Sequence, residues 1–175
     1  MFLDWFMRVG FFIIALMMSL WVGVVSTASA EEPVPEAAVR AAYLYNFALF
    51  THWPTENETT VDICSLGEDA TTAAMVRLEG KKVRNRGVKV TIAVSGKKLE
   101  NCDLLYLAQH NSELLPVNLA NSAILTVADD GQDPNAVIHL AISQERVVFD
   151  VNLAAARAKG LEISSRLLNL ARRVY

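Results

Sequence analysis

The sequence predicts an α/β fold: a single-domain sandwich of a mixed, mostly parallel sheet flanked by helices, with a C-terminal antiparallel hairpin and helix. Three observations support it. Short apolar runs without alternation, at residues 102–108 and 123–129, are typical of parallel strands buried on both faces. Segments with a 3.6-residue apolar period lie between strand-like runs, and the last third of the chain changes to strict alternation. Strands that alternate with helices favour a parallel sheet.

The N-terminus has the composition of a secretory signal peptide. An apolar run of about 17 residues, Val9 to Val25, follows a short segment with one arginine and is at the short end for spanning a bilayer. Ala28-Ser29-Ala30, a motif with small residues at its first and third positions, follows the apolar run. The pattern predicts a signal peptide over residues 1–30, cleaved between Ala30 and Glu31, and one domain over residues 31–175. An uncleaved anchor helix is the alternative interpretation.

Composition limits the function classes. Cleavage leaves about 145 residues, the size of one domain. The chain carries a net charge of −3, so it has no basic bias of the kind that binds nucleic acid. Beyond the leader, no apolar run approaches spanning length. We therefore expect no membrane insertion after cleavage, and an extracytoplasmic location.

Residues 36–50 have the pattern of the first helix of the domain. One stripe with a 3.6-residue period consists of Val39, Tyr43, Phe47 and Phe50. Alanines and leucines widen the stripe until the segment is apolar nearly all round, which is typical of a buried helix. The residue before Pro54 is pushed out of the helical conformation, so the helix is expected to end just before it.

The middle of the chain predicts strands at residues 61–67 and 88–95, and helices at 68–80 and 112–121. Between the helix at 68–80 and the strand at 88–95, residues 81–87 form a basic loop. Such a loop can meet an acidic partner, or it can simply be solvated.

The last third predicts a hairpin followed by helices. Residues 137–143 and 146–152 alternate with period two and are joined at Gln144-Glu145, which indicates an antiparallel pair. Residues 153–160 read as a short helix ended by a glycine. A final helix is expected over residues 163–175, with these side chains inward: Ile163, Leu167, Leu170 and Val174.

Two cysteines, Cys64 and Cys102, lie outside the leader. In an oxidising compartment such a pair suggests one disulfide. Closing a loop of about 38 residues would stabilise the fold by about 3–4 kcal/mol in the chain-entropy model. Two buried free thiols are the alternative interpretation.

Motifs for catalysis and cofactor binding are absent from the sequence. There is no glycine-rich nucleotide fingerprint, no phosphate loop and no nucleophile elbow. The three histidines lack ligand-pair spacing, and no C-x-x-C occurs. We therefore predict a protein that is not an enzyme, with no catalytic residues, no metal and no cofactor.

Three residues are candidates for a ligand site. His52 beside Trp53 can form an aromatic–imidazole pocket at the end of the first helix. Asp129 ends a buried strand, where α/β folds often place functional groups. Packing over the core and a solvated turn are the respective alternatives.

Blocks along nearly the whole mature chain resemble one known family. The segments AAYLYNFALFTHWP, ICSLGED, NCDLLYLA and RVVFDVNLAAARAKGLEISSRLLNLARRV, in that order, are similar to YfiR-like periplasmic proteins. The last block is the most specific. The chain departs from the family at His52, where members often have an acidic residue, and at residues 133–140, where members often have a Gly-Gly-Met-Ile-like stretch. A second cysteine pair found in some members is missing.

The resemblance implies a regulator that is not an enzyme. YfiR-like proteins bind the periplasmic part of an inner-membrane diguanylate cyclase and hold it inactive, which lowers cyclic-di-GMP and biofilm formation. Cys64 and Cys102 match a family disulfide. The resemblance places partner contact in the segment that contains Asp150, Asn152, Arg157, Leu161, Ile163 and Arg166. Another sensor protein as the partner, and a homodimer, stay open.

A periplasmic small-molecule-binding module that feeds a membrane sensor or transporter is the alternative function. It would need an apolar pocket with convergent polar groups near Asp129 or beneath Trp53.

Overall fold

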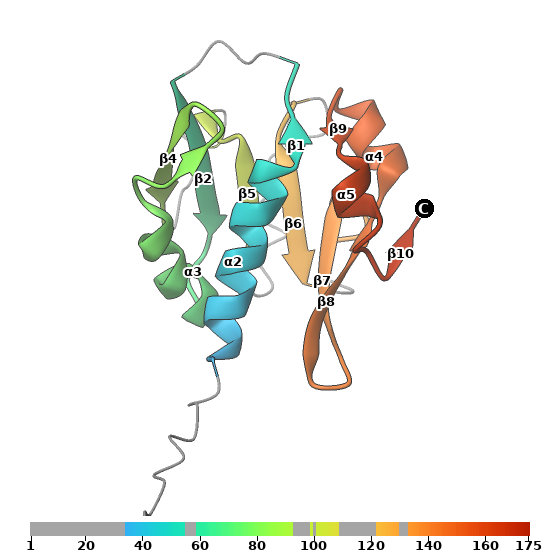
Figure 1. Ribbon diagram of the computed structural model, residues 1–175, viewed down its shortest axis with the longest axis horizontal. Helices are drawn as coiled ribbons and strands as arrows, with labels where there is room; N and C mark the ends of the chain where they lie inside the picture. Colours follow the sequence, from blue (N-terminus) through green and yellow to red (C-terminus); the bar gives the residue numbers. More distant parts are fainter. Residues whose placement is uncertain (1–33, 55–58, 93–98, 100, 109–121, 130–132) are drawn as a thin grey trace, which may run out of the picture. The chain divides into compact units, whose positions relative to one another are not determined.

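An eight-stranded mixed sheet forms the centre of the domain (Figure 1). The computed structural model describes residues 34–54, 59–92, 99, 101–108, 122–129 and 133–175. The strands of the sheet are β2 (Thr60–Leu66), β3 (Lys82–Val83), β4 (Arg86–Thr91), β5 (Leu104–Leu107), β6 (Leu125–Asp129), β7 (Ile138–Ser143), β8 (Arg146–Val151) and β10 (Arg173–Val174). Their order is β10-β8-β7-β6-β5-β2-β4-β3.

The central strands are parallel and the outer pairs include antiparallel ones. β7, β6, β5, β2 and β4 run in one direction, whereas β8 is antiparallel to β7 and β3 is antiparallel to β4. At one edge, β10 pairs in parallel with β8. The predicted α/β class with a mostly parallel sheet and a C-terminal antiparallel hairpin is confirmed.

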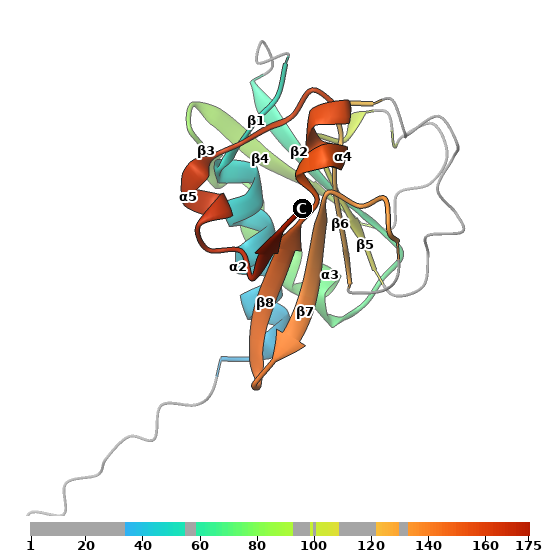
Figure 2. The same cartoon turned by 90° about the vertical axis from the view of Figure 1, so that its right-hand side faces the viewer.

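Helices flank this sheet. They are α2 (Glu36–Leu49), α3 (Ala70–Met75), the 3₁₀ turn η1 (Val76–Leu78), α4 (Leu153–Ala158) and α5 (Ser165–Leu168). Helix α2 crosses one face of the sheet and α3 lies beside it (Figures 1 and 2). Two further strands, β1 (Thr51–His52) and β9 (Glu162–Ile163), pair with each other in antiparallel orientation.

Only one face of α2 is fully buried. Its buried residues are Ala41, Leu44, Phe47 and Ala48. The predicted stripe packs on the core, because Phe47 is fully buried and Val39, Tyr43 and Phe50 are partly buried against the same cluster. The rings of Tyr43 and Phe47 pack on Phe149 of β8, with centroid distances of 5.6 and 5.0 Å. Within α2 beyond its first residue, Ala42 alone is exposed, which the all-round apolar pattern did not indicate.

The parallel strands bury both faces, as their unbroken apolar runs predict. Alternate residues of β2 and β5 enter two separate hydrophobic clusters: Ile63 and Leu104 pack in the cluster beneath α2, and Cys64 and Leu105 pack in the other. Full burial of a leucine or isoleucine side chain stabilises a fold by about 1.5–3 kcal/mol. The two clusters together hold these strands in place.

The predicted hairpin is present. β7 and β8 pair over six registered positions, from Ile138 opposite Val151 to Ser143 opposite Arg146. The two linking residues, Gln144 and Glu145, have φ values of 49° and 60°. Positive φ at both central positions is the geometry of a two-residue turn that matches the twist of the strands.

The predicted final helix is wrong. α4 ends at Ala158, and the expected glycine, Gly160, follows its C-cap with a φ of 69°. The following helix, α5, covers only residues 165–168, and the chain then extends into β10. Leu170 and Val174, predicted to point inward, are 70% and 43% exposed.

Other predicted elements are shorter than expected or lie outside the described residues. The predicted helix at 68–80 is α3 followed by η1, and it begins at an Asp69 capping box. The predicted helix at 112–121 and the signal peptide at 1–30 lie outside the described residues.

Candidate functional site

The C-terminal region, which the resemblance implicates in partner contact, is organised around Asp150. This residue of β8 is 1% exposed. Arg172 donates to both of its oxygens, from Nε at 2.8 Å and from Nη2 at 2.6 Å. Arg173 adds bonds of 3.0 Å and 2.5 Å to Oδ2. The hydrogen bond from Arg172, followed by the one from Arg173, lowers the pKa of Asp150 to about 2, against the opposing effect of burial.

Backbone bonds complete this arrangement, which we name the Asp150 clasp (Asp150, Arg172, Arg173 and strand β10). The amide of Arg172 donates to the Phe149 carbonyl at 2.8 Å, and the amide of Tyr175 donates to the Val151 carbonyl at 3.0 Å. The Tyr175 carbonyl accepts from Leu153 at the start of α4. The clasp attaches residues 172–175 to β8 and makes β10 the edge strand.

Four of the six predicted partner-binding residues are buried or partly buried, and two are exposed. Asp150 and Leu161 are buried, and the Asn152 side chain caps α4 by accepting from the Ala155 amide at 2.9 Å. Ile163 is half-buried and pairs with Thr51 across β9 and β1. Arg157 and Arg166 are exposed. Of the six, these two arginines are the side chains that present most of themselves to a partner.

His139 lies between Ile138 and Leu140 in β7 and is a buried polar residue. The alternation along β7 does not by itself assign it a function. It lies opposite Asp150 in the β7–β8 register and is 4% exposed. Its ring centroid is 6.4 Å from that of Tyr175. Its Nε2 atom has no hydrogen-bond partner among the described residues. His139 therefore packs beside Asp150 and Tyr175.

Cys64 and Cys102 form a disulfide, as predicted from their number and compartment. Their Cα atoms are 5.9 Å apart, within the range that a disulfide requires. Both residues are buried. The bond joins β2 to the segment just before β5, and so it fixes the parallel part of the sheet.

The three predicted ligand-binding residues do not converge. His52 is exposed on β1, just after the end of α2. Trp53 is 5% exposed, and its indole Nε1 donates to the Asp103 carbonyl at 3.1 Å. Asp129 lies at the far end of β6 and pairs with Arg40 in the first half of α2. His52 and Asp129 are thus at opposite ends of α2, and ligand binding by any of the three stays a prediction.

A polar cluster lies where β5 and β6 end. Arg40 pairs with Asp129 and, at 2.7 Å, with Glu36. Burial, aided by the charge of Asp129, raises the pKa of Tyr106, so its hydroxyl stays protonated. That hydroxyl donates to the Asp69 carboxylate at 3.0 Å. Both carboxylates therefore have partners within the domain.

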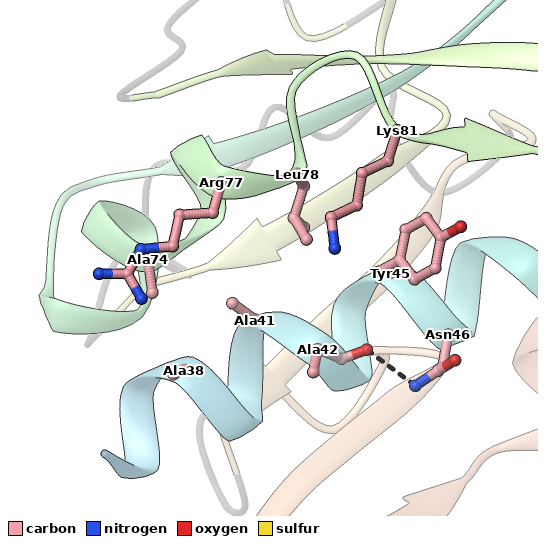
Figure 3. A pocket seen from close by; sticks show the side chains of 9 residues that line it. All are labelled: Ala38, Ala41, Ala42, Tyr45, Asn46, Ala74, Arg77, Leu78 and Lys81. Carbon is pink, nitrogen blue, oxygen red and sulfur yellow. Dashed lines mark hydrogen bonds between the residues drawn. The ribbon is translucent and has the colours of Figure 1, made fainter. Parts of the chain in front are cut away.

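A pocket of about 200 Å³ lies between α2 and the α3–η1 segment (Figure 3). We name it the α2–α3 groove. Its lining residues are Ala38, Ala41, Ala42, Tyr45, Asn46, Ala74, Arg77, Leu78 and Lys81. Figure 3 shows the side chains of Leu78 and Lys81 pointing across the groove toward α2. Sequence patterns alone do not identify this groove, since they assign the alanines to a buried helix.

The predicted basic loop is largely structural. Arg84 donates to the Thr51 carbonyl at 3.0 Å, just past the end of α2. Arg86 is 8% exposed and pairs with Asp103 at 2.9 Å. Lys81 is different, because it is exposed and lies 5.4 Å from the centre of the Tyr45 ring. Of these three basic side chains, Lys81 is the one that lines the groove.

The described residues contain neither a candidate metal cluster nor a helix that could span a membrane. No group of three or more His, Cys, Asp or Glu side chains there could hold a metal ion. No helix in the same residues has the length and apolar character needed to cross a bilayer.

Comparison with known proteins identifies the family. A model of the YfiR/HmsC-like family matches residues 37–172. The chain belongs to the YfiR/HmsC-like family. The resemblance seen in the sequence is thereby confirmed. No curated protein matches the chain in a sequence search.

Membership in the YfiR/HmsC-like family limits the range of functions. The family is periplasmic, regulatory and non-catalytic. Membership suggests a regulator of a diguanylate cyclase. The family match also includes the whole of β8, α4 and α5, and so contains all six predicted contact residues.

Proposed function

We propose that this protein binds the periplasmic domain of an inner-membrane diguanylate cyclase and holds the enzyme inactive, which lowers cyclic-di-GMP and biofilm formation. The observation that carries the proposal is the family match over residues 37–172. The proposal includes a periplasmic location, reached by cleavage of a signal peptide at residues 1–30.

The disulfide supports a periplasmic location. Disulfides persist in oxidising compartments and are rare where thiols are kept reduced. Here both cysteines of the chain are joined in one buried bond. A protein that depends on such a bond is suited to the periplasm.

Inhibition requires that the protein distinguish two states of its partner. A ligand with equal affinity for an active and an inactive state shifts neither population, however tightly it binds. The proposed repressor must therefore bind the inactive periplasmic domain better. The exposed Arg157 and Arg166 can contribute to that contact, whereas Asp150, Asn152 and Leu161 support it by holding the segment in shape.

Deletion of the gene tests the function directly. We expect cyclic-di-GMP to rise in the deletion strain and to return to its original level when the full chain is supplied from a plasmid. An unchanged cyclic-di-GMP level in the deletion strain would contradict the proposal. Recovery of a cyclase with the tagged protein from solubilised membranes is the matching binding test.

Cleavage of the leader has its own measurement. The protein recovered from the periplasmic fraction should begin at Glu31. If the protein stays in the membrane fraction with its first 30 residues attached, the leader is an uncleaved anchor helix and the cleavage prediction is wrong.

A further inference from the structure

The segment at residues 50–54, which follows helix α2, pairs with the C-terminal part of the chain. Its strand β1 lies beside β9 (Figure 1). In this antiparallel pair, Thr51 is opposite Ile163 and His52 is opposite Glu162. Among the described residues, β9 pairs with β1 and with no strand of the main sheet, so β9 depends on the 50–54 segment for its strand pairing.

Two further contacts connect the same parts of the chain. The Ser164 amide donates to the Phe50 carbonyl at 2.9 Å. A Cβ atom placed on Gly160 would lie 3.8 Å from Cγ of Pro54, which is an ordinary packing distance. Residues on both sides of β9 therefore contact the 50–54 segment.

The bond at Ser164 also affects the start of helix α5. The Ser164 side chain accepts from the Arg166 amide at 3.3 Å and caps this helix. Arg166 is one of the two exposed arginines of the predicted contact segment. Because the Ser164 amide bonds to Phe50, the 50–54 segment helps to determine where the helix that carries Arg166 begins.

The 50–54 segment is itself attached to the core. Thr51 and Trp53 are 0% and 5% exposed, whereas His52 between them is exposed. The Thr51 hydroxyl donates to the Phe47 carbonyl in the last turn of α2 at 2.8 Å. The inward side chains of this segment thus anchor it, and Thr51 attaches it to α2.

Trp53 attaches the segment to the central sheet. Its indole Nε1 donates to the carbonyl of Asp103, the residue before β5, at 3.1 Å. The Asp103 carboxylate pairs with Arg86 at 2.9 Å, and the Arg86 guanidinium lies 5.8 Å from the centre of the Trp53 ring. A buried N–H group without an acceptor is costly, so the bond to Asp103 favours one orientation of the indole.

We propose that Trp53 is a positioning residue for partner binding. By bonding to Asp103 it holds the 50–54 segment, and through β1 that segment sets the position of β9 and of Arg166. This inference rests on the proposed function, in which the C-terminal segment contacts the cyclase. A contact segment that is already ordered loses less conformational entropy on binding, so Trp53 raises affinity without touching the partner.

Trp53→Phe tests this role, because it removes the indole N–H and keeps an aromatic ring in the core. Tyr43→Phe is the matched control, since it removes a hydroxyl that donates to the Val147 carbonyl at 3.3 Å and leaves β1 and β9 unaltered. We expect hydrogen exchange of the β9 amides to become up to about tenfold faster in Trp53→Phe and to stay unchanged in Tyr43→Phe. Binding to the detergent-solubilised cyclase should weaken several-fold in Trp53→Phe alone.

Ser164→Pro tests the same connection from the C-terminal side. Ser164 has a φ of −58°, which proline adopts, and proline lacks the amide that donates to Phe50. Ser164→Ala is the control, because it also loses the cap of α5 but keeps the amide. We expect Ser164→Pro to bind the cyclase several-fold more weakly than Ser164→Ala and to lower cyclic-di-GMP less in the deletion strain. This second pair keeps the test valid if Trp53→Phe misfolds.

The positioning role requires exchange and binding to change together. If Trp53→Phe and Ser164→Pro match their controls in both measurements, β9 does not depend on the 50–54 segment and the proposal is wrong. Faster exchange in β9 with unchanged binding would also overturn it, since the segment would then order β9 without affecting the partner. Weaker binding with unchanged exchange would overturn it too, because Trp53 would act by another route. An unchanged cyclic-di-GMP level after gene deletion is a separate result, since it removes the proposed function and leaves the exchange measurement valid.

Discussion

The two halves of the sheet are held together by different chemistry. In the parallel half, the Cys64–Cys102 disulfide joins β2 to the segment before β5. In the antiparallel half, the buried carboxylate of Asp150 on β8 binds two arginines from the end of the chain. One connection is covalent and the other is ionic.

This difference means that the halves respond to different conditions. A disulfide is insensitive to mild acid but is broken by reductant. An ion pair is insensitive to reductant but is lost when its carboxylate is protonated. Reduction and acid should therefore weaken the same domain by separate routes.

Reduction of the disulfide should have the largest effect. Opening the 38-residue loop is expected to lower the free energy of unfolding by about 3–4 kcal/mol. Urea unfolding with and without dithiothreitol measures this loss. A variant with both cysteines replaced by alanine is the control, since reductant should leave its stability unchanged. Equal stability of the oxidised and reduced protein would contradict the prediction.

Asp150→Asn should come next. The variant removes a buried carboxylate that accepts charge-assisted hydrogen bonds from Arg172 and Arg173, and we expect a loss of about 3 kcal/mol at neutral pH. Arg173→Gln is the matched control, because Arg173 is 65% exposed and should cost less than about 1 kcal/mol. Chemical unfolding of the three proteins compares them. If Asp150→Asn is as stable as the unaltered protein, the clasp has no role in stability.

Acid should remove a smaller part of the same contribution. The folded pKa of Asp150, about 2, lies below its ordinary value of 3.8. The stabilisation is therefore fully present above the ordinary value and is lost as the pH falls through the folded one, a difference of about 2 kcal/mol. Unfolding measured at about pH 5 and about pH 2 should show the gap between the unaltered protein and Asp150→Asn narrowing by that amount. A gap that stays constant would show that another group controls the acid response.

Local patterns explain why much of the fold could be predicted. The β7–β8 hairpin follows from alternation that each strand carries by itself, with two residues between. The buried parallel strands follow from short apolar runs. The cysteine pair needed only its number and an oxidising compartment.

The end of the chain could not be predicted, because its conformation depends on a contact with a distant residue. The apolar spacing of Leu167, Leu170 and Val174 fits a helix. Arg172 and Arg173, however, reach Asp150, which is 22 and 23 residues away in sequence, and extend the chain along β8. No local pattern contains that contact.

The candidate sites were predictable only in part. A resemblance identifies the C-terminal segment as important, but it does not separate residues that shape the segment from residues that face a partner. The α2–α3 groove escaped prediction because an alanine-rich helix face is open or covered according to the length of its neighbour. Here α3 spans only Ala70–Met75 and packs on α2, so that Ala41 is buried while Ala42 stays exposed beside a small pocket.

The smallest effect concerns Asn152, where a structural role and a contact role can be separated. Its side chain accepts from the Ala155 amide and begins α4, so Asn152→Ala should cost about 1 kcal/mol, as loss of a helix cap usually does. Asn152→Asp keeps an acceptor of the same size and should retain the stability. We expect the aspartate variant also to restore low cyclic-di-GMP in the deletion strain, because the cap supports the neighbouring surface without touching the partner. A variant that is stable yet fails to repress would instead assign Asn152 to the contact itself.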